Sequence, residues 1–219
     1  MTPNELSTLI AEKQGRPLDV PFKLMIMERA KAWRSRLLKN TLEFNPIERR
    51  FFKQTIIVKM EKQFITGCVD VPGVNCMEAV SDEIPQPLRV GGTLFDYVGG
   101  VDGKSPFGIA DIGTEFYLNA GKYSQGEVRY TWHSPRIKVN RPTVPYIMVT
   151  SIFDDPVAVN ALTCEGQGDC DYWDKEWPAG GELLQLIIQS LETIDFRRPN
   201  EPDNDRRPEV LVGKERGDQ

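Results

Sequence analysis

The single histidine, His133, limits the chemistry that this sequence is expected to perform. A nucleophilic serine or cysteine needs an adjacent base, and imidazole is the usual one, so such an arrangement would have to be built around this residue. His133 lies in the segment YTWHSP, at the end of a predicted strand and among aromatic residues. We therefore interpret it as a structural or surface histidine, and we do not expect an enzyme.

The segment GGVDGKS, residues 99–105, resembles a phosphate-binding loop. A P-loop has four residues between its first glycine and the Gly-Lys pair, and the helix that follows points its N-terminus at the phosphates. Here Gly99 leaves three residues, and Pro106, Phe107 and Gly108 follow in place of a helix-forming run. The sequence therefore predicts a tight β-turn.

An acidic segment, EGQGDCDYWDKEW, could offer oxygen ligands to a hard cation through Asp169, Asp171, Asp174 and Glu176. It lacks the central glycine and the distal glutamate of an EF-hand loop. We interpret it as a solvated acidic loop, or one that meets a basic partner surface, and expect no metal or other cofactor. A metal-dependent hydrolase that uses this loop stays open as one alternative.

The four cysteines are Cys68, Cys76, Cys164 and Cys170, with seven intervening residues in the first pair and five in the second. Neither spacing is that of a zinc knuckle, and His133 alone could complete a site. The sequence therefore favours buried or idle free thiols, as is usual for intracellular cysteine.

The bulk composition is that of a globular protein, with 219 residues of which 40% are hydrophobic and 27% charged. Such a chain buries roughly 70% of its unfolded surface, which is enough for one core or for one core and a small lobe. No stretch approaches the roughly 18 apolar residues of a membrane span, and the start shows no signal layout. We expect synthesis in a cytoplasm and no membrane partner.

Charge is distributed unevenly along the chain. Residues 1–63 hold 13 Lys and Arg against 7 Asp and Glu, whereas residues 64–196 hold 8 against 19. Opposite poles on one subunit suit contacts between unlike faces, as in a ring whose subunits meet head to tail. Ordinary solvated helix faces are the alternative, and a pI of about 5.1 argues against nucleic-acid recognition.

Helices are predicted at both ends of the chain. Thr2, Pro3 and Glu5 form a capping pattern for a first helix that runs to about Lys13. A second helix begins near Pro21 and has an apolar stripe with basic residues interleaved: Phe22, Ile26, Ala30, Trp33 and Leu37.

Asn45, Pro46 and Glu48 repeat the capping pattern and predict a third helix, through Phe52, Ile56, Met60 and Phe64, that ends by Gly67. A last helix, ELLQLIIQSLETI, follows Pro178, and its broad apolar face should pack on the N-terminal helices.

Between these helices the sequence predicts a β-rich lobe, because short β-prone runs alternate with Gly and Pro from Cys68 onwards. In EVRYTWHS, one predicted face holds Val128, Tyr130 and Trp132, and the other is expected to be wet. The segment from Pro156 to Trp177 is predicted to be an irregular acidic loop. The expected fold is thus α+β, with a helical domain of residues 1–67 and 178–196 and an inserted lobe of residues 68–177.

The last segment, residues 197–219, is predicted to be an extended tail. Its one apolar run, Val210, Leu211 and Val212, could add as a strand to the sheet edge of a neighbour. A terminus without a partner is the alternative.

The segment CDYWDKEWPAGGELLQLIIQSLETIDFRRPNEPDNDRR resembles the ring proteins of crAss-like bacteriophages, small virion proteins in the head-to-tail connector. The opening segments MTPNELSTLIAEKQG, PFKLMIMERAKAWRSRLLKN and NPIERRFFKQTIIVKMEKQF are similar to the helical start of such chains. The resemblance implies a homo-oligomeric ring of twelve subunits, stacked against the portal and other tail rings. The genome would pass through its lumen without sequence-specific contact, and no catalytic residue would be carried over.

Together these observations predict a structural protein of the virion tail or neck. The residues expected at intersubunit or inter-ring contacts are Arg34, Arg36, Arg49, Arg50, Asp169, Asp171, Asp174, Val210, Leu211 and Val212. The main rival hypothesis is a monomeric module whose lobe binds a sugar or other ligand through Tyr97, Tyr117, Tyr130 and Trp132.

Overall fold

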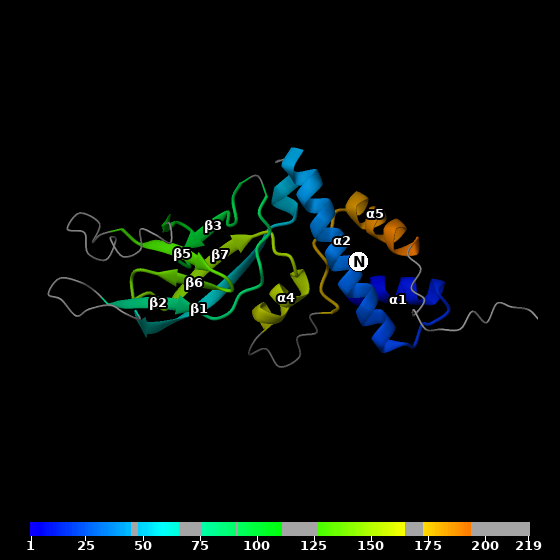
Figure 1. Cartoon of the computed structure of the whole chain (residues 1–219), viewed down its shortest axis with the longest axis horizontal. Coiled ribbons are helices and arrows are strands. Elements are labelled where there is room, and N and C mark those ends of the chain that lie inside the picture. The colour runs from blue at the N-terminus through cyan, green and yellow to red at the C-terminus, as the bar shows by residue number, and fades with distance from the viewer. Residues whose placement is uncertain (45–47, 66–75, 91, 111–126, 165–172, 194–219) are drawn as a thin grey trace, which may run out of the picture.

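The chain folds into a mixed α+β structure, known from a computed structural model. The structure describes residues 1–44, 48–65, 76–90, 92–110, 127–164 and 173–193, without the side chains of 41–48 and 164. Helices α1, α2 and α5 lie at one side and a curled sheet at the other, with α4 between them (Figure 1). We call α1, α2, α5 and the short helix η1 the helical lobe, and the strands with α4 the sheet lobe.

Helix α1 spans Pro3–Lys13 and confirms the predicted capping pattern. The Thr2 hydroxyl accepts from the Glu5 backbone N–H at 3.1 Å, and the Glu5 carboxylate accepts from the Thr2 N–H at 2.9 Å. After the helix, Gly15 adopts a φ of 70°, which glycine reaches at little cost. The first turn and its stop are therefore specified by local residues alone.

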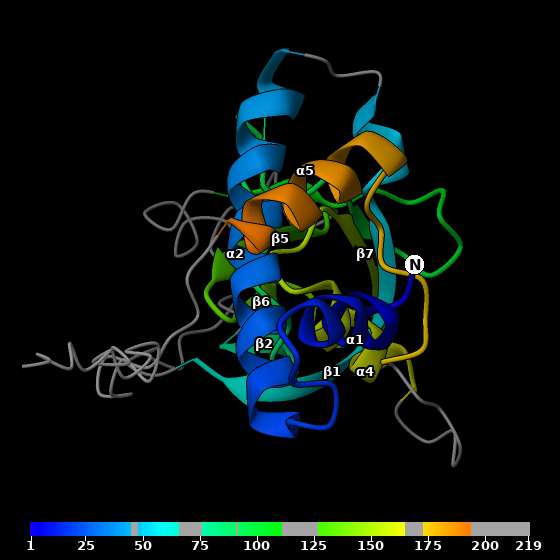
Figure 2. The ribbon, with the colours of Figure 1, turned by 90° about the vertical axis from the view of Figure 1, so that its right-hand side faces the viewer.

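Helix α2 spans Val20–Phe44, and α5 spans Gly181–Glu192. Helices α1 and α5 pack side by side across α2 (Figure 2), as their apolar stripes predict. The ion pair between Lys13 and Glu192 links α1 to the end of α5. The core of this lobe includes Leu6, Ile10, Phe22, Ile26, Ala30, Leu38, Trp177, Leu183, Ile187 and Leu191.

The sheet has seven strands in the order β3-β7-β1-β2-β6-β5-β4, antiparallel except for the parallel pair β4 and β5. Strand β1 is the longest, and its first half pairs with β7 while its second half pairs with β2. The strands are β1 Gln54–Phe64, β2 Met77–Ser81, β3 Tyr97–Gly99, β4 Gly108–Ile109, β5 Arg129–His133, β6 Arg136–Val139 and β7 Tyr146–Ser151.

The two edges of this sheet are joined through residues 106–110. On one side the Phe107 N–H donates to the Val98 carbonyl at 2.8 Å. On the other side the Ala110 N–H donates to the Tyr130 carbonyl at 2.8 Å. The curled sheet thus closes on itself here, and both edges find backbone partners that an open edge would lack.

The predicted third helix is wrong. Residues 48–51 form the 3₁₀ helix η1 (Glu48–Phe51), and β1 follows from Gln54. Ile56, Val58 and Met60 are buried in alternation with exposed neighbours, which is the period of a strand. The strand therefore begins inside the range that the sequence assigned to the helical domain.

The segment from Pro156 is also not wholly irregular, because Pro156–Cys164 forms helix α4. The Asp155 carboxylate accepts from the backbone N–H groups of Val157 and Ala158, at 2.9 and 3.1 Å. Asp155 followed by Pro156 at the first helical position is a recognised start signal that the sequence prediction missed. The helix covers the sheet by packing against β1.

Strand β5 meets the expectation for one face but not for the other. Tyr130 is buried, and the half-buried Val128 and Trp132 pack against the same core. On the opposite face Thr131 is 3% exposed, so this face is not wet as predicted.

Cys76 is disulfide-bonded, so the expectation of a free thiol at this position is wrong. The other three cysteines, Cys68, Cys164 and Cys170, have side chains outside the described part of the chain. Among the described residues, no helix is both long enough and apolar enough to cross a bilayer.

Candidate interaction surface

The segment that resembles a phosphate loop is a tight turn, as predicted. The Asp102 carboxylate accepts from the backbone N–H groups of Lys104 and Ser105, at 3.0 and 3.2 Å, and Gly103 adopts a φ of 68°. These hydrogen bonds hold the pKa of Asp102 below its ordinary value, and the bond from the Lys104 backbone has the largest effect. The carboxylate is thus committed to the turn.

The aromatic residues of the rival ligand-binding hypothesis do not converge on a described pocket. Tyr130 and Trp132 pack edge-on against Phe95, with ring centroids 6.1 and 5.3 Å apart, inside the sheet core. The Tyr97 hydroxyl donates to the Gly100 carbonyl at 3.0 Å, and Tyr117 lies outside the described residues. Where the structure describes them, these side chains stabilise the sheet lobe.

The metal hypothesis depends on an acidic loop that the structure only partly describes. Asp169 and Asp171 lie outside the described residues, and Asp174 accepts from the Asn4 side-chain amide at 3.3 Å. No group of three potential ligand side chains occurs among the residues that can be placed.

Arg34 is fully buried and does not lie on a surface. Its guanidinium Nη1 donates to the Phe153 carbonyl at 2.9 Å and its Nε to the Pro178 carbonyl at 3.2 Å. Burial lowers the pKa of Arg34 to about 10, so the side chain stays charged at neutral pH. The expectation that Arg34 contacts a neighbouring subunit is therefore corrected, because it joins α2 to the segments around β7 and α5.

Two neighbours of Arg34 on α2 reinforce this junction. Lys31 forms ion pairs with Asp155 at 2.7 Å and with Glu28 at 3.0 Å. Burial acts to lower the pKa of Lys31, but its hydrogen bonds to these two carboxylates raise the pKa above the ordinary value. Ser35 donates to Asp154, so both acids before α4 are bound to α2.

Arg49 is also used inside the chain. Its guanidinium donates to the Val90 carbonyl at 2.9 Å and to the Thr93 hydroxyl at 2.7 Å, and lies 3.2 Å from the Asp96 carboxylate. With only 15% of its side chain exposed, Arg49 ties η1 to the segment before β3. Arg49 thus has a role inside the chain, and its predicted role at a subunit contact stays a prediction.

Arg36 and Arg50, the other two basic residues of the predicted contact set, do lie on the surface. The Arg36 guanidinium lies 5.5 Å from the Trp33 ring centroid, and that of Arg50 lies 4.9 Å from the Phe51 ring centroid. Neither forms an ion pair within the described part of the chain, and the same holds for Lys39 of α2. This end of the helical lobe therefore presents cations to solvent.

Several acids of the sheet lobe form ion pairs with cations of the same lobe. Glu78 pairs with Lys138 at 2.8 Å, and Glu83 and Glu127 pair with Arg136 and Arg129. The acidic pole that the sequence predicts is thus weaker, in the described ranges, than the net charge alone indicates.

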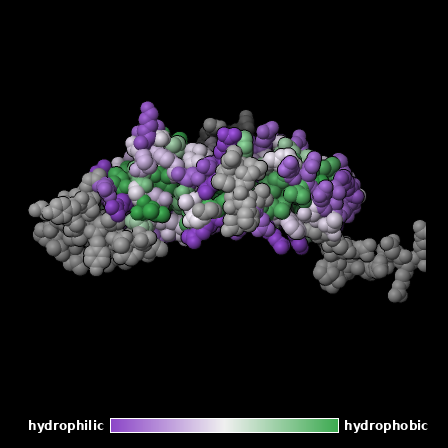
Figure 3. Space-filling model, turned by 90° about the horizontal axis from the view of Figure 1, so that it is seen from above, coloured by the Kyte–Doolittle hydropathy of each residue, from purple (hydrophilic) through white to green (hydrophobic). Residues whose placement is uncertain are grey.

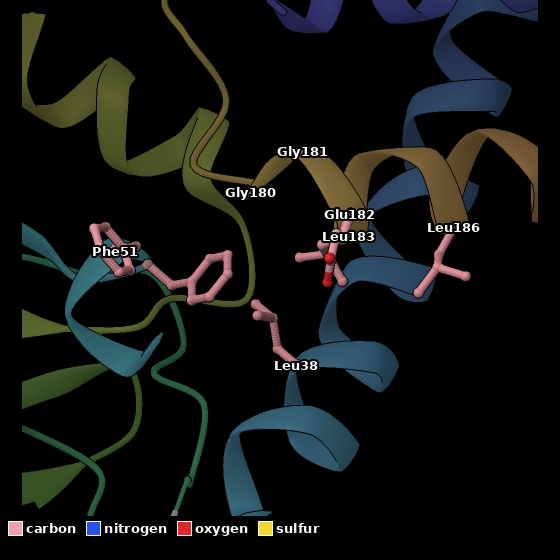
Figure 4. A pocket seen from close by; sticks show the side chains of 8 residues that line it. Leu38, Phe51, Gly180, Gly181, Glu182, Leu183 and Leu186 are labelled. Carbon is pink, nitrogen blue, oxygen red and sulfur yellow. The ribbon is translucent and has the colours of Figure 1, made fainter. Parts of the chain in front are cut away.

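An apolar groove opens between η1, the second half of α2 and the start of α5 (Figure 4). Its volume is about 280 Å³. The described side chains that line it are apolar except for Glu182. They are Leu38, Phe51, Phe52, Glu182, Leu183 and Leu186, with the backbone of Gly180 and Gly181 completing the wall.

The groove has a buried floor and an exposed rim. Leu38, Phe52 and Leu183 form the floor and are at most 7% exposed. Phe51 and Leu186 stand at the rim with 64% and 47% exposure. Seen from above, hydrophobic surface is visible over the sheet lobe on the left and over the helical lobe on the right, with hydrophilic groups between the two (Figure 3). Large apolar side chains that gather around a groove indicate a binding surface rather than scattered exposure.

A second hollow lies between α4 and the sheet, with a volume of about 540 Å³. It is wide open and lined mainly by apolar and proline residues, namely Ile84, Pro85, Pro135, Ala158, Ala161 and Leu162, together with Glu83. The Glu83 carboxylate already accepts from Arg136, so this hollow offers no converging polar groups.

The sequence prediction missed Phe51 and Leu186. Phe51 and Phe52 are adjacent, so only one of them can face the core, and that pair was a signal of an exposed aromatic. Leu186 widens the apolar face of α5 beyond the buried row of Leu183, Ile187 and Leu191, which was a signal of a second contact. Val210, Leu211 and Val212 lie outside the described residues.

No protein-family model matches this chain, and no curated protein shows significant similarity to it.

Proposed function

We propose that the protein is a structural virion protein that assembles into an oligomeric ring in the head-to-tail connector or tail of a bacteriophage. Its partners are copies of itself, the portal and neighbouring tail rings, and genome DNA passes through the lumen without sequence-specific contact.

The observation that carries this proposal is the surface at the end of the helical lobe. Phe51 and Leu186 are exposed there beside a groove, and Arg36, Lys39 and Arg50 are exposed cations that form no ion pair with the residues that the structure describes. Apolar anchors with a charged rim are the usual make-up of a protein–protein interface. The resemblance to crAss-like phage ring proteins points the same way.

The disulfide at Cys76 supports a location outside a reducing cytoplasm. Disulfides are rare in cytosolic proteins but persist in secreted proteins and at virion surfaces. A virion subunit is made in the reducing cytoplasm of the host and is exposed to oxidising conditions once the particle is released.

Charge reversal tests the proposed surface. We expect Arg36→Glu combined with Arg50→Glu to weaken self-association at least about tenfold, because two exposed cations at the proposed contact are replaced by anions. Higher salt should weaken the wild type in the same direction. Light scattering on a size-exclusion column measures the mass as a function of concentration.

Arg141→Glu combined with Lys104→Glu is the matched control, since both residues are exposed on the sheet lobe and carry the same charge change. Equal effects of the two double variants would remove the helical lobe from the interface. A wild-type chain that stays monomeric at micromolar concentration would favour the monomeric binding module instead.

A further inference from the structure

We infer that the groove of Leu38, Phe51, Phe52, Leu183 and Leu186 binds the Val210–Leu211–Val212 segment of a neighbouring copy of the chain. The inference rests on the proposed ring, and it names both the surface and the segment through which neighbours engage.

The groove suits a short aliphatic segment better than a small molecule. Its volume of about 280 Å³ lies at the lower end of the range of roughly 300–1,000 Å³ that is usual for ligand pockets. Its one charged side chain is Glu182, in the first turn of α5, so no set of polar groups converges to orient a cofactor. A segment with a few branched apolar side chains therefore suits the apolar lining of this groove.

The C-terminal segment contains one such run. After Thr193 the chain continues for 26 residues, and Val210, Leu211 and Val212 are its only three consecutive apolar residues. The charges beside the run are mixed, with Glu209 directly before it and Arg206 and Arg207 further upstream. The match with the groove therefore rests on the apolar composition of the run.

The length of the linker allows the segment to reach the groove of a neighbour in the proposed ring. Helix α5 has 12 residues, so its two ends lie about 18 Å apart, with the groove at the first end and the tail at the other. The 16 residues that connect Thr193 to Val210 include Pro199, Pro202 and Pro208. A linker of 16 residues can span up to about 50 Å at roughly 3.1 Å per residue, so the segment is able to reach the groove of an adjacent subunit in the proposed ring.

A peptide experiment tests the groove without requiring a ring. A fluorescent peptide of residues 204–217 is added to the full chain carrying Leu211→Asp, so that the chain's own run cannot compete. We expect saturable but weak binding, because three side chains bury little area and the segment must become ordered.

Leu186→Glu should weaken peptide binding at least about tenfold, and Phe51→Ser, on the opposite wall, should weaken it in the same direction. Gln185→Glu is the matched control, because Gln185 is an exposed neighbour on α5 that does not line the groove. Circular dichroism checks that the variants fold. The absence of saturable binding, or equal weakening by Leu186→Glu and Gln185→Glu, overturns the inference.

A crosslinking experiment on the full chain identifies which copy supplies the segment. Leu211 is replaced by the photoreactive residue p-benzoylphenylalanine in an equal mixture of ¹⁴N-labelled and ¹⁵N-labelled chains. We expect mass spectrometry to find crosslinks from position 211 to groove peptides that join a light chain to a heavy one. Crosslinks within single chains only would overturn the assignment to a neighbour.

The two proposals fail separately. If the Leu211→Asp chain still forms rings while the peptide does not bind, the groove inference falls and the ring stands. If the peptide binds the groove but the chain forms only dimers at every concentration, the ring falls and the groove assignment stands.

Discussion

Arg34 shows how one residue can join the parts of this molecule. It donates from α2 to the Phe153 carbonyl on one side and to the Pro178 carbonyl on the other, while its Nη2 finds no partner in the described part of the chain. A buried cation with incomplete pairing is costly in isolation, so its value lies in fixing the lobes relative to one another.

Replacing Arg34 by alanine should therefore lower the free energy of unfolding by about 2–4 kcal/mol, because a cavity forms and the carbonyls of Phe153 and Pro178 lose their donor. Arg36→Ala removes the same side chain from an exposed position of the same helix and should change stability by less than about 0.5 kcal/mol. Urea unfolding followed by circular dichroism measures both. Similar losses for the two variants would mean that Arg34 does not hold the junction.

For single residues, the sequence contained signals of burial that the prediction did not use. The cap of Thr2, Pro3 and Glu5 was predicted correctly because all its partners are local. Arg34 was predicted to be on the surface because it is charged, although it continues the i, i+4 row of Ile26, Ala30 and Leu38, which are all buried. Periodicity, rather than residue type, was the better guide.

At the scale of elements, β1 is the segment whose identity most affects the fold. It is paired along both halves, to β7 and to β2, so the sheet cannot form without it. A helix was predicted because Phe52, Ile56, Met60 and Phe64 are four residues apart, a spacing that one face of a strand also satisfies. The run of β-branched residues that contains Val58 favours a strand over a helix, and it was the feature that could have distinguished the two.

A pair of substitutions separates strand from helix in solution. Ile56→Ala should cost about 2–5 kcal/mol of unfolding free energy, because Ile56 is 1% exposed. Ile57→Ala, its neighbour at 60% exposure, should cost less than about 1 kcal/mol. Chemical denaturation of the two variants gives the comparison, and equal costs would contradict an alternating strand.

For the whole molecule, the sequence predicted which parts meet but not how the sheet is arranged. The terminal helices pack together because their apolar stripes have no other cover, and this was predictable. The closure of the sheet through residues 106–110 depends on pairings between distant segments, which leave little trace in a single sequence. The groove was equally hidden, since it requires η1, α2 and α5 in their final places.

The shape that results has two lobes with different surfaces. Several acids of the sheet lobe form ion pairs within it, whereas the end of the helical lobe exposes apolar side chains and cations that form no ion pair with the described residues. An uneven surface of this kind suits a heterologous contact, in which one face of a subunit meets a different face of the next. Contacts of this kind close into a ring when the rotation between neighbours divides a full turn evenly, which the proposed function requires.

The central claim is that copies of this chain close into such a ring. Electron microscopy of the purified full chain, concentrated until association is complete by light scattering, tests it most directly. We expect class averages of closed rings of uniform subunit number with an open lumen. Isolated two-lobed particles at every concentration, or open chains without closure, would contradict the account.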